Sequence, residues 1–396
     1  MNRKYADRFF QYFFRMVSLV SVLALGAILI FVFAQGLMPF VGATAPGIRL
    51  VVQNIGELAV NGRVYRNVPD SISLEEDARF ISLRFPSGDA GEEVVDIEVN
   101  ADERDARKRL VFARNPSAKV SYPEAYVVTL GWPGLMAGRD RKIHIILPEP
   151  PYSPVEFIGG MQWQPVRDKV FGVFPMIAGT VLASLGAIFL GVPVALLCAL
   201  FMAEFLADRP AAFARGAIEL LAGIPSVVYG FFGLMVIVPA VKNVFGIAAG
   251  NTLLSAVVVL ALMILPTVIT IAESSMRAVS LSLKEASLSL GASKMQTAWH
   301  ITLFHAHSGV IAGIILGISR AVGETMAVIL VAGNSPQLVF SPLESVRTLT
   351  ATIAMEMGYA SGRHSEMLFS IGVVLFIMIL ALNSLILRLR RGMDVV

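Results

Sequence analysis

Two charged residues lie inside an otherwise apolar segment and are the first candidates for chemistry. Arg320 and Glu324 interrupt the run 307–331 four residues apart, a spacing that places both on one face of a continuous helix. A charge at the bilayer centre costs about 2.5–3.5 kcal/mol on insertion scales, so neither is expected to face lipid. Arginine suits an oxyanion because its planar group offers several donors and stays charged. The pair therefore predicts either a site on a polar pathway or a mutual ion pair.

The segment 280–298 is the second candidate, because it is too polar to cross a membrane yet carries apolar residues at near-helical spacing. Those residues are Leu283, Ala286, Leu288, Gly291 and Met295. A short amphipathic helix at a membrane surface faces lipid headgroups, its own helical bundle or a partner protein. The spacing alone leaves these three interpretations open.

Both segments belong to a chain of 396 residues of which 56% are hydrophobic and 15% charged, against about 25% charged in soluble domains. The mean hydropathy of +0.70 is too high for a soluble enzyme of this length. A helix needs about 20 apolar residues to cross a bilayer. We therefore predict an all-α membrane protein with about six spans, at 16–34, 170–203, 220–241, 247–271, 307–331 and 367–387. The first run exceeds the core of about 7–15 residues in a signal peptide, so we expect an uncleaved anchor.

Glycines and a proline within the apolar runs predict how the spans pack and bend. Gly309, Gly313 and Gly317 recur every four residues, so they share one helix face and allow a neighbouring helix to approach closely. Pro225 lies in the third run and is expected to kink or break it, because proline removes a backbone donor.

Charged residues concentrate between the first and second spans, where residues 41–165 hold 31 of the 61 formal charges. Short β-branched and aromatic stretches alternate there with Gly, Pro, Asn and Asp, which is typical of strands and turns. The predicted strands are 48–52, 57–65, 80–85, 94–99, 109–113, 126–130 and 142–147. We expect a small sandwich or barrel. The chain then has three parts: 1–40 with the first span, a β-rich insert at 41–160, and a five-helix core at 161–396.

Basic residues in the short connections predict the orientation in the membrane. The N-terminus, the connections 204–219 and 273–294 and the C-terminal tail hold 12 Lys and Arg, whereas the opposite short connections hold 3. We therefore expect both termini in the cytoplasm and the β-rich insert outside it.

The polar segment resembles a motif of known membrane proteins. The residues E-A-S, three further residues and G at 285–291 are followed by I-T-L-F at 301–304. This order is similar to the EAA loop of the permease subunits of bacterial import ABC transporters, with serine for an alanine and Phe304 for a proline. The resemblance implies a coupling helix bound by an ATP-hydrolysing subunit, with Glu285, Ala286 and Gly291 as contact residues. Glu285 is expected near the N-terminus of that helix, where the helix dipole favours a carboxylate.

A second resemblance is narrower. The stretch RAVGETMAV at 320–328 looks like the fifth-span signature of PstC-type subunits of phosphate importers, and the stretches 171–185, 223–234 and 348–358 agree with it. It implies the type I importer permease fold and a substrate pathway that includes Arg320, Glu324 and Thr325. The insert departs from the pattern, because the family has a shorter segment there.

The resemblance implies a function and a set of partners. It implies a transport subunit for inorganic phosphate in the bacterial inner membrane, paired with a PstA-type permease, two ATPase subunits and a periplasmic phosphate-binding protein. The sequence has no G-x-x-x-x-G-K-[ST] loop, so ATP and Mg are expected on the ATPase subunits, with no enzyme activity, cofactor or metal in this chain. Alternatives are another oxyanion such as sulfate or molybdate, a membrane-anchored sensor, and an intramembrane protease built on Ser319.

Overall fold

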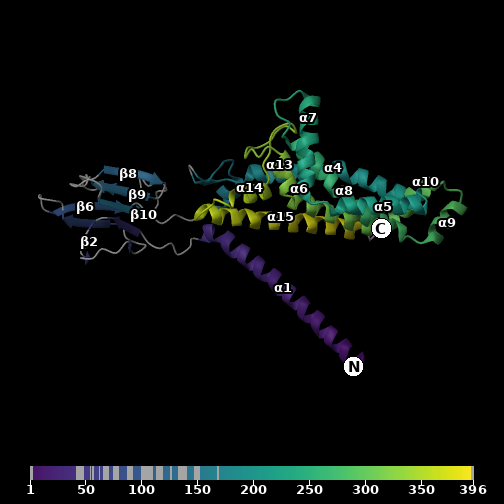
Figure 1. Ribbon diagram of the computed structural model, residues 1–396, viewed down its shortest axis with the longest axis horizontal. Coiled ribbons are helices and arrows are strands. Elements are labelled where there is room, and N and C mark those ends of the chain that lie inside the picture. The colour runs from purple at the N-terminus through teal and green to yellow at the C-terminus, as the bar shows by residue number, and fades with distance from the viewer. Residues whose placement is uncertain are drawn as a thin grey trace. The chain divides into compact units, whose positions relative to one another are not determined.

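A computed structural model describes residues 3–41, 49–53, 55, 58–61, 63–65, 71–74, 80–86, 92–99, 110–112, 119–124, 127–132, 141–146, 152–166 and 169–393 (Figure 1). The chain divides into two compact units. One unit comprises Met38–Pro154 and Val166–Lys169, and the other comprises Met1–Leu37, Val155–Pro165 and Val170–Val396. The first unit holds most of the predicted insert, of which several stretches, including 101–109, lie outside the described residues.

The described strands of the first unit form two antiparallel five-stranded sheets (Figure 1). One sheet has the order β4 (Ser71–Ser73), β1 (Arg49–Gln53), β10 (Arg141–Ile146), β9 (Val127–Trp132) and β8 (Lys119–Glu124). The other has the order β3 (Arg63–Tyr65), β2 (Leu58–Val60), β5 (Phe80–Pro86), β6 (Glu92–Val99) and β7 (Leu110–Phe112). The predicted stretch 57–65 is a hairpin of two strands, and the prediction omitted β4 and β8.

The two sheets share one hydrophobic core. Alternate residues are buried along β1 and β10 of one sheet and along β5 and β6 of the other, as the two-residue period of a strand requires. They are Leu50, Val52, Ile143, Ile145, Ile81, Leu83, Val95 and Ile97. Because one cluster takes side chains from both sheets, the sheets pack face to face, which is consistent with a sandwich.

The second unit is helical apart from the hairpin of β11 (Trp163–Gln164) and β12 (Val170–Phe171). Its helices up to the third span are α1 (Arg3–Val41), α3 (Pro154–Gly159), α4 (Phe174–Glu204), α5 (Asp208–Gly223), α6 (Ser226–Phe232), the π-helix η2 (Gly233–Ile237) and α7 (Val238–Phe245). They are followed by α8 (Leu253–Arg277), α9 (Leu281–Ser289), α10 (Lys294–Thr297), the π-helix η3 (Ala298–Thr302), α11 (Leu303–His305), α12 (His307–Gly323), α13 (Met326–Val331), α14 (Leu349–Glu356) and α15 (Arg363–Met393).

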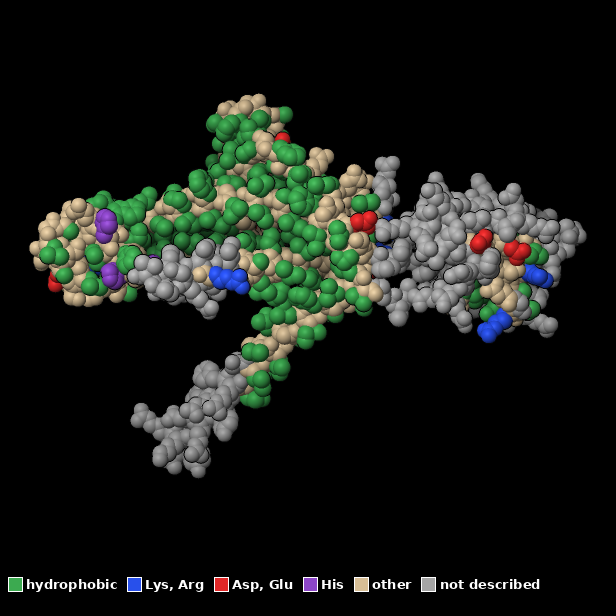
Figure 2. Space-filling view, turned by 180° about the vertical axis from the view of Figure 1, so that it is seen from behind, with side chains coloured by type: hydrophobic (Ala, Val, Ile, Leu, Met, Phe, Trp, Pro, Cys, Tyr) green, Lys and Arg blue, Asp and Glu red, His purple; other side chains and the backbone are tan. Residues whose placement is uncertain are grey.

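Five described helices are long and apolar enough to cross a membrane, and the bent pair Lys294–His305 and His307–Gly323 makes a sixth if the two helices are counted as one span. The five are Leu19–Val41, Phe174–Glu204, Ser226–Phe245, Leu253–Arg277 and Arg363–Ser384. Hydrophobic side chains cover most of the visible face of the bundle (Figure 2). The chain is therefore a multi-pass membrane protein, in agreement with the predicted spans.

Helix α8 lies at the centre of the bundle, and small residues let α4 and α12 approach it closely. A Cβ placed on Gly186 of α4 would lie 2.6 Å from the Val257 side chain of α8. On α12, the three predicted glycines all face α8, and a Cβ on Gly309 would lie 1.9 Å from the Ser275 hydroxyl. Contacts this short exclude larger side chains, so the predicted close approach is confirmed.

Three breaks in the described part of the chain interrupt or border the apolar runs that were predicted as spans. The first lies at Ile224 and Pro225, between α5 and α6, as Pro225 predicts. The second is a bend of 71° before His307, which is present although Phe304 replaces the proline of the family pattern. The third separates α12 from α13 and contradicts the expectation of one continuous helix over 307–331.

Candidate functional site

The break between α12 and α13 contains Glu324 and Thr325, and Arg320, the third predicted pathway residue, lies in the last turn of α12. Helix α12 ends at Gly323, and Glu324 has extended backbone angles of φ −69° and ψ 134°. Thr325, with φ −120° and ψ −60°, precedes the first residue of α13, Met326. The expectation that Arg320 and Glu324 share one face of a continuous helix is therefore wrong, because the helix ends between them.

Arg320 forms no ion pair with Glu324 in the described part of the chain. Its Nη1 instead donates a hydrogen bond of 3.2 Å to the Thr267 hydroxyl of α8. The side chain is half-buried, and a hydroxyl brings no counter-charge to it. The alternative of a mutual, neutralising ion pair is thus not supported.

The Glu324 carboxylate caps the helix that follows it. Its Oε1 accepts a hydrogen bond of 3.0 Å from the backbone N–H of Ala327, which satisfies a free donor at the start of α13. The Glu324 carbonyl accepts a hydrogen bond of 2.8 Å from the Thr350 hydroxyl of α14. The Thr325 hydroxyl donates to the Gly323 carbonyl at 3.3 Å. Side chains on both sides of the break therefore hold its backbone.

Helix α14 is fixed against α4 beside this break. The backbone N–H of Leu349 donates 3.0 Å to the Thr180 hydroxyl of α4, and the Thr348 side chain accepts from the N–H of Ala351 as a helix cap. Thr180, Thr348 and Thr350 are all buried. Threonine hydroxyls therefore link α4, α14 and the α12–α13 break inside an apolar bundle.

The polar segment 280–298 is a helix–turn–helix rather than the single helix we predicted. Helix α9 ends in a hydrogen-bonded turn in which the N–H of Gly291 donates to the Leu288 carbonyl at 3.0 Å and the N–H of Ala292 donates to the Ser287 carbonyl at 3.3 Å. Gly291 has φ +88°, the left-handed conformation that this termination needs and glycine adopts freely. A Cβ on Gly291 would meet nothing within 4 Å, so backbone conformation is the reason for glycine here.

The predicted contact residues of this segment are exposed on the surface of the helical unit. Glu285, Ala286 and Gly291 are exposed, and α9 has no buried residue. Leu281 and Leu290 are also exposed, at 67% and 90%. Glu285 lies in the middle of α9, so the expectation that it sits near the helix N-terminus is wrong. The arrangement leaves a mixed polar and apolar surface available to a partner.

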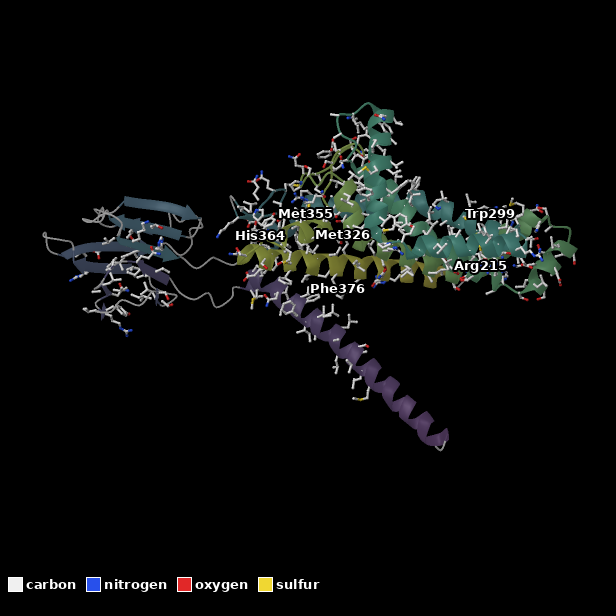
Figure 3. The ribbon with its side chains drawn as sticks, viewed as in Figure 1. Arg215, Trp299, Met326, Met355, His364 and Phe376 are labelled. Atoms are coloured by element: carbon white, nitrogen blue, oxygen red, sulfur yellow. The ribbon has the colours of Figure 1, made fainter. Side chains whose placement is uncertain are left out.

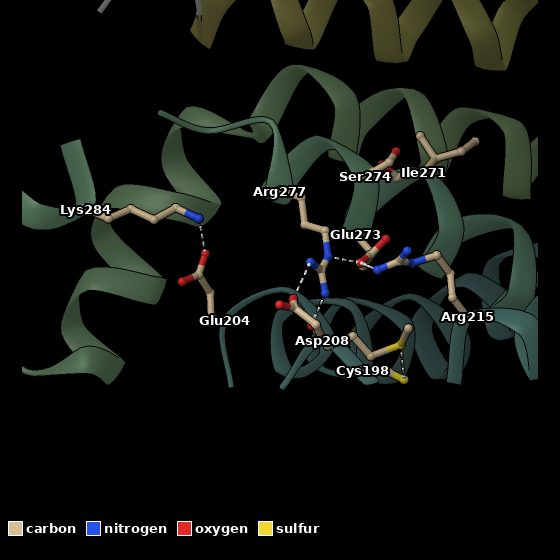
Figure 4. A network of polar contacts seen from close by, with 10 residues as sticks. Cys198, Glu204, Asp208, Arg215, Ile271, Glu273, Ser274, Arg277 and Lys284 are labelled. Atoms are coloured by element: carbon tan, nitrogen blue, oxygen red, sulfur yellow. Dashed lines mark hydrogen bonds and ion pairs between the residues drawn. The ribbon is translucent and has the colours of Figure 1, made fainter. Parts of the chain in front are cut away.

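Ion pairs join the neighbouring helices at this end of the bundle, which we call the α9 end (Figure 4). Glu273 of α8, 3% exposed, accepts from Arg277 and, at 3.3 Å, from Arg215 of α5. Glu204 at the end of α4 pairs with Lys284 of α9 at 2.6 Å. These carboxylates are not among the residues predicted from the sequence. Their position could have indicated a role, because Glu204 and Glu273 each lie at the end of an apolar run.

A second buried carboxylate lies at the opposite end, where α15 begins. His364 marks this end in Figure 3, and Arg215 marks the α9 end. Glu356 is 5% exposed and accepts hydrogen bonds of 2.8 Å from Arg347, from the Trp163 indole and from His364. The carboxylate therefore joins the β11–β12 hairpin to α14 and α15. Burial first, and then this carboxylate, raise the pKa of the nearby Tyr359 phenol, so the phenol stays protonated.

The described residues offer no support for metal or protease chemistry. No group of three His, Cys, Asp or Glu side chains among them could hold a metal ion. The Ser319 hydroxyl donates 3.3 Å to the Asn383 side-chain oxygen of α15, and an amide oxygen is not a base that would activate it.

The helical unit combines helices long enough to cross a membrane with a half-buried arginine and an exposed polar segment between two spans. These features are typical of a membrane transport protein. The chain belongs to the family described as "Binding-protein-dependent transport system inner membrane component", whose family model matches residues 191–395. It is thus a permease subunit of an ABC transporter. ATP hydrolysis and substrate capture in such importers lie with partner proteins.

Individual relatives support the narrower resemblance. The chain is 36% identical over 229 residues to "Probable ABC transporter permease protein YqgH" of Bacillus subtilis, covering 57% of this chain and 74% of the relative. It is 34% identical over 313 residues to "Phosphate transport system permease protein PstC" of Xylella fastidiosa, covering 73% of this chain and 94% of the relative. The resemblance to PstC-type permeases is thereby confirmed.

Among solved structures, the "MetNI methionine ABC transporter" in inward-facing conformations is similar to this chain. The match covers 56% of this chain and 94% of that chain, at 19% identity and a TM-score of 0.43.

Proposed function

We propose that this chain is the PstC-type permease subunit of an ATP-driven importer of inorganic phosphate, with the type I importer permease fold. The observation that carries the substrate class is Arg320, a half-buried cation inside a membrane span with no ion pair among the described residues. Such a cation favours an anionic ligand, and a guanidinium matches the oxygens of phosphate. The phosphate relatives support the same substrate.

The substrate pathway runs past the α12–α13 break in this proposal. Arg320 contacts the anion, and Thr325 lines the pathway beside the interrupted backbone, as broken helices do in other transporters. Glu324 does not contact phosphate, because two anions repel. It holds the break in place through its bonds to α13 and α14.

Coupling to ATP hydrolysis uses the exposed helix–turn–helix. Glu285, Ala286 and Gly291 contact the ATPase subunit, whose closure upon ATP binding moves α9 and α10 and opens the pathway outward. ATP and Mg are bound by the ATPase subunits, and this chain holds no cofactor or metal. Two such subunits, a PstA-type permease and a periplasmic phosphate-binding protein complete the complex.

The orientation in the bacterial inner membrane follows the charge bias of the connections. Both termini and the α9 end lie in the cytoplasm, and the β-rich insert 41–160 lies outside. We also propose the three-part division into 1–40, 41–160 and 161–396. It follows from the apolar first run and from the charged, β-rich stretch after it. A role as a sensor is the weaker candidate, because the matching family and the PstC relatives are transport proteins.

Replacement of Arg320 tests the proposed function. In the complete complex, Arg320→Gln is expected to abolish phosphate uptake while leaving assembly with the ATPase subunit intact, because the positive charge proposed to contact the anion is lost and the exposed segment 280–298 is unchanged. The matched control is Arg209→Gln, which removes an exposed arginine of α5. Uptake of labelled phosphate in proteoliposomes is the measurement, and normal uptake by the Arg320 variant contradicts the proposal.

Competition distinguishes phosphate from the other oxyanions. Sulfate or molybdate in excess is expected to leave phosphate uptake unchanged in the same proteoliposomes. Inhibition by either anion, together with its own transport, assigns the chain to that substrate instead.

A further inference from the structure

We propose that Glu204, at the C-terminal end of α4, is a positioning residue that fixes the coupling segment 280–298 to α4, so that movement of this segment reaches the centre of the bundle directly. The inference rests on the proposed function, since it concerns how ATP-driven movement is transmitted. Without this link, α9 would lose its ion pair to α4 and act on the bundle less directly.

The Glu204 carboxylate bridges two parts of the chain that follow α8. Its Oε1 accepts a hydrogen bond of 2.6 Å from Lys284 Nζ of α9 and one of 2.9 Å from the Thr302 hydroxyl of η3. The side chains of Glu204 and Lys284 are only 10% and 14% exposed, and Thr302 is fully buried. Water screens such a pair less than a surface ion pair, so it holds its geometry more firmly.

The residue that follows α4, Phe205, makes a parallel contact to the other helix of the segment. Lys294 Nζ of α10 lies 5.4 Å from the centre of the Phe205 ring, within the range of a cation–π interaction. Two consecutive residues at the end of α4 therefore each hold one lysine of the coupling segment. The contacts involve both α9 and α10, so the segment is attached as a unit.

The same end of α4 is attached to α8. Arg277 Nη2 of α8 donates a hydrogen bond of 3.2 Å to the Met202 carbonyl, and the Glu273 carboxylate holds the Arg277 guanidinium. Farther along, the close approach at Gly186 packs α4 against Val257 of α8. A displacement of α9 that pulls on Glu204 therefore moves α4 and α8 together.

The charge and the length of the side chain both matter for this role. A glutamine at 204 keeps an oxygen acceptor for Thr302 but loses the ionic attraction to Lys284. Removing one member of a partly buried ion pair leaves the other charge uncompensated. We therefore expect the glutamine variant to loosen the coupling segment from α4 while leaving the bundle folded.

The test compares Glu204→Gln with Glu219→Gln in the reconstituted complex. Glu219 is exposed on α5 and is the matched control. The number of phosphate ions transported per ATP hydrolysed is expected to fall about fivefold or more in the Glu204 variant, in the range of usual coupling between sites. Basal ATP hydrolysis and subunit stoichiometry are expected to match the control. An unchanged transport ratio, or a parallel loss of assembly and ATP hydrolysis, overturns the proposal.

A charge exchange and a measurement independent of substrate complete the test. The double variant Glu204→Lys with Lys284→Glu is expected to recover at least part of the transport ratio that either single variant loses. Hydrogen exchange is measured before and after the complex is trapped with ATP and vanadate. In the wild type, trapping is expected to change the protection of amides in both α9 and the end of α4. In Glu204→Gln, it is expected to change protection in α9 only. Changes confined to α9 in the wild type overturn the positioning role even where phosphate uptake is observed. Absence of phosphate uptake by the wild type overturns the proposed function alone.

Discussion

At the scale of single residues, a buried or constrained side chain reveals its role by its partners rather than by its type. Glu324 and Glu356 are both acidic residues in apolar surroundings, yet one caps α13 and the other joins Arg347, His364 and the Trp163 indole. Neither carboxylate is left without hydrogen bonds, as burial of a charge requires. Both carboxylates therefore hold neighbouring groups in place, whereas Arg320 donates to a neutral hydroxyl and has no ion pair among the described residues.

Gly291 gives a prediction at this scale. Its left-handed φ of +88° costs a residue with a Cβ about 1 kcal/mol or more, although nothing nearby would clash with that Cβ. We expect Gly291→Ala to accelerate amide exchange at the end of α9 about fivefold, because local opening becomes easier by that free energy. Asparagine tolerates this conformation, so Gly291→Asn is expected to have a smaller effect.

The control for Gly291 is Gly216→Ala in α5, a glycine with open space around it. It is expected to slow exchange in α5, because alanine favours the helix interior by about 1 kcal/mol. If Gly291→Ala leaves exchange in α9 unchanged but weakens binding of the ATPase subunit, the glycine serves close approach of the partner instead.

At the scale of elements, the break at Glu324 gives the second prediction. Glu324→Gln keeps a side-chain oxygen that accepts from the N–H of Ala327, whereas Glu324→Ala removes the cap, at a cost of about 1 kcal/mol. If the carboxylate acts as a cap, glutamine retains most phosphate uptake and alanine loses most of it. Equal loss in both variants shows that the negative charge itself is needed, and two unaffected variants contradict any role for this side chain.

The helices and breaks that could be predicted are those set by residues close together in the sequence. Charge-free apolar runs located the spans, and Pro225 located a break, because hydrophobicity and the missing proline donor act wherever they occur. The break between α12 and α13 has no proline and was missed. It is fixed by tertiary bonds, notably the Thr350 hydroxyl on the Glu324 carbonyl, which no spacing within the span reveals. The omitted strand β8 contains Pro123, a residue that argues against a strand when only the sequence is read.

The candidate site follows the same division. Arg320 and the exposure of the segment 280–298 were predictable. An arginine within an apolar run and a polar segment between two spans both stand out from the surrounding sequence. The ion pair between Glu204 and Lys284 was not predictable, since its members lie 80 residues apart. Long-range pairs of this kind depend on how α4 and α9 are placed by the packing of α4 on α8.

At the scale of the whole molecule, the two units have separate hydrophobic cores. The core of the first unit consists of strand residues between 50 and 145, and the cores of the helical unit consist of residues from 183 onward. The segment Val155–Pro165, which contains Trp163, belongs to the helical unit. A unit of about 120 residues is large enough to bury a core of its own, so the strands do not depend on the helices for their burial.

The last prediction is that the fragment 38–154 folds alone and does not bind phosphate. Its described strands bury a shared core without help from the helical unit, so the fragment is expected to be soluble and β-rich by circular dichroism. Residues 38–154 carry 14 basic and 16 acidic residues, and such a balance does not concentrate an anion. Calorimetry with phosphate is therefore expected to give no heat of binding. A helical or insoluble product contradicts the independent fold, and micromolar affinity for phosphate shows that this unit captures substrate.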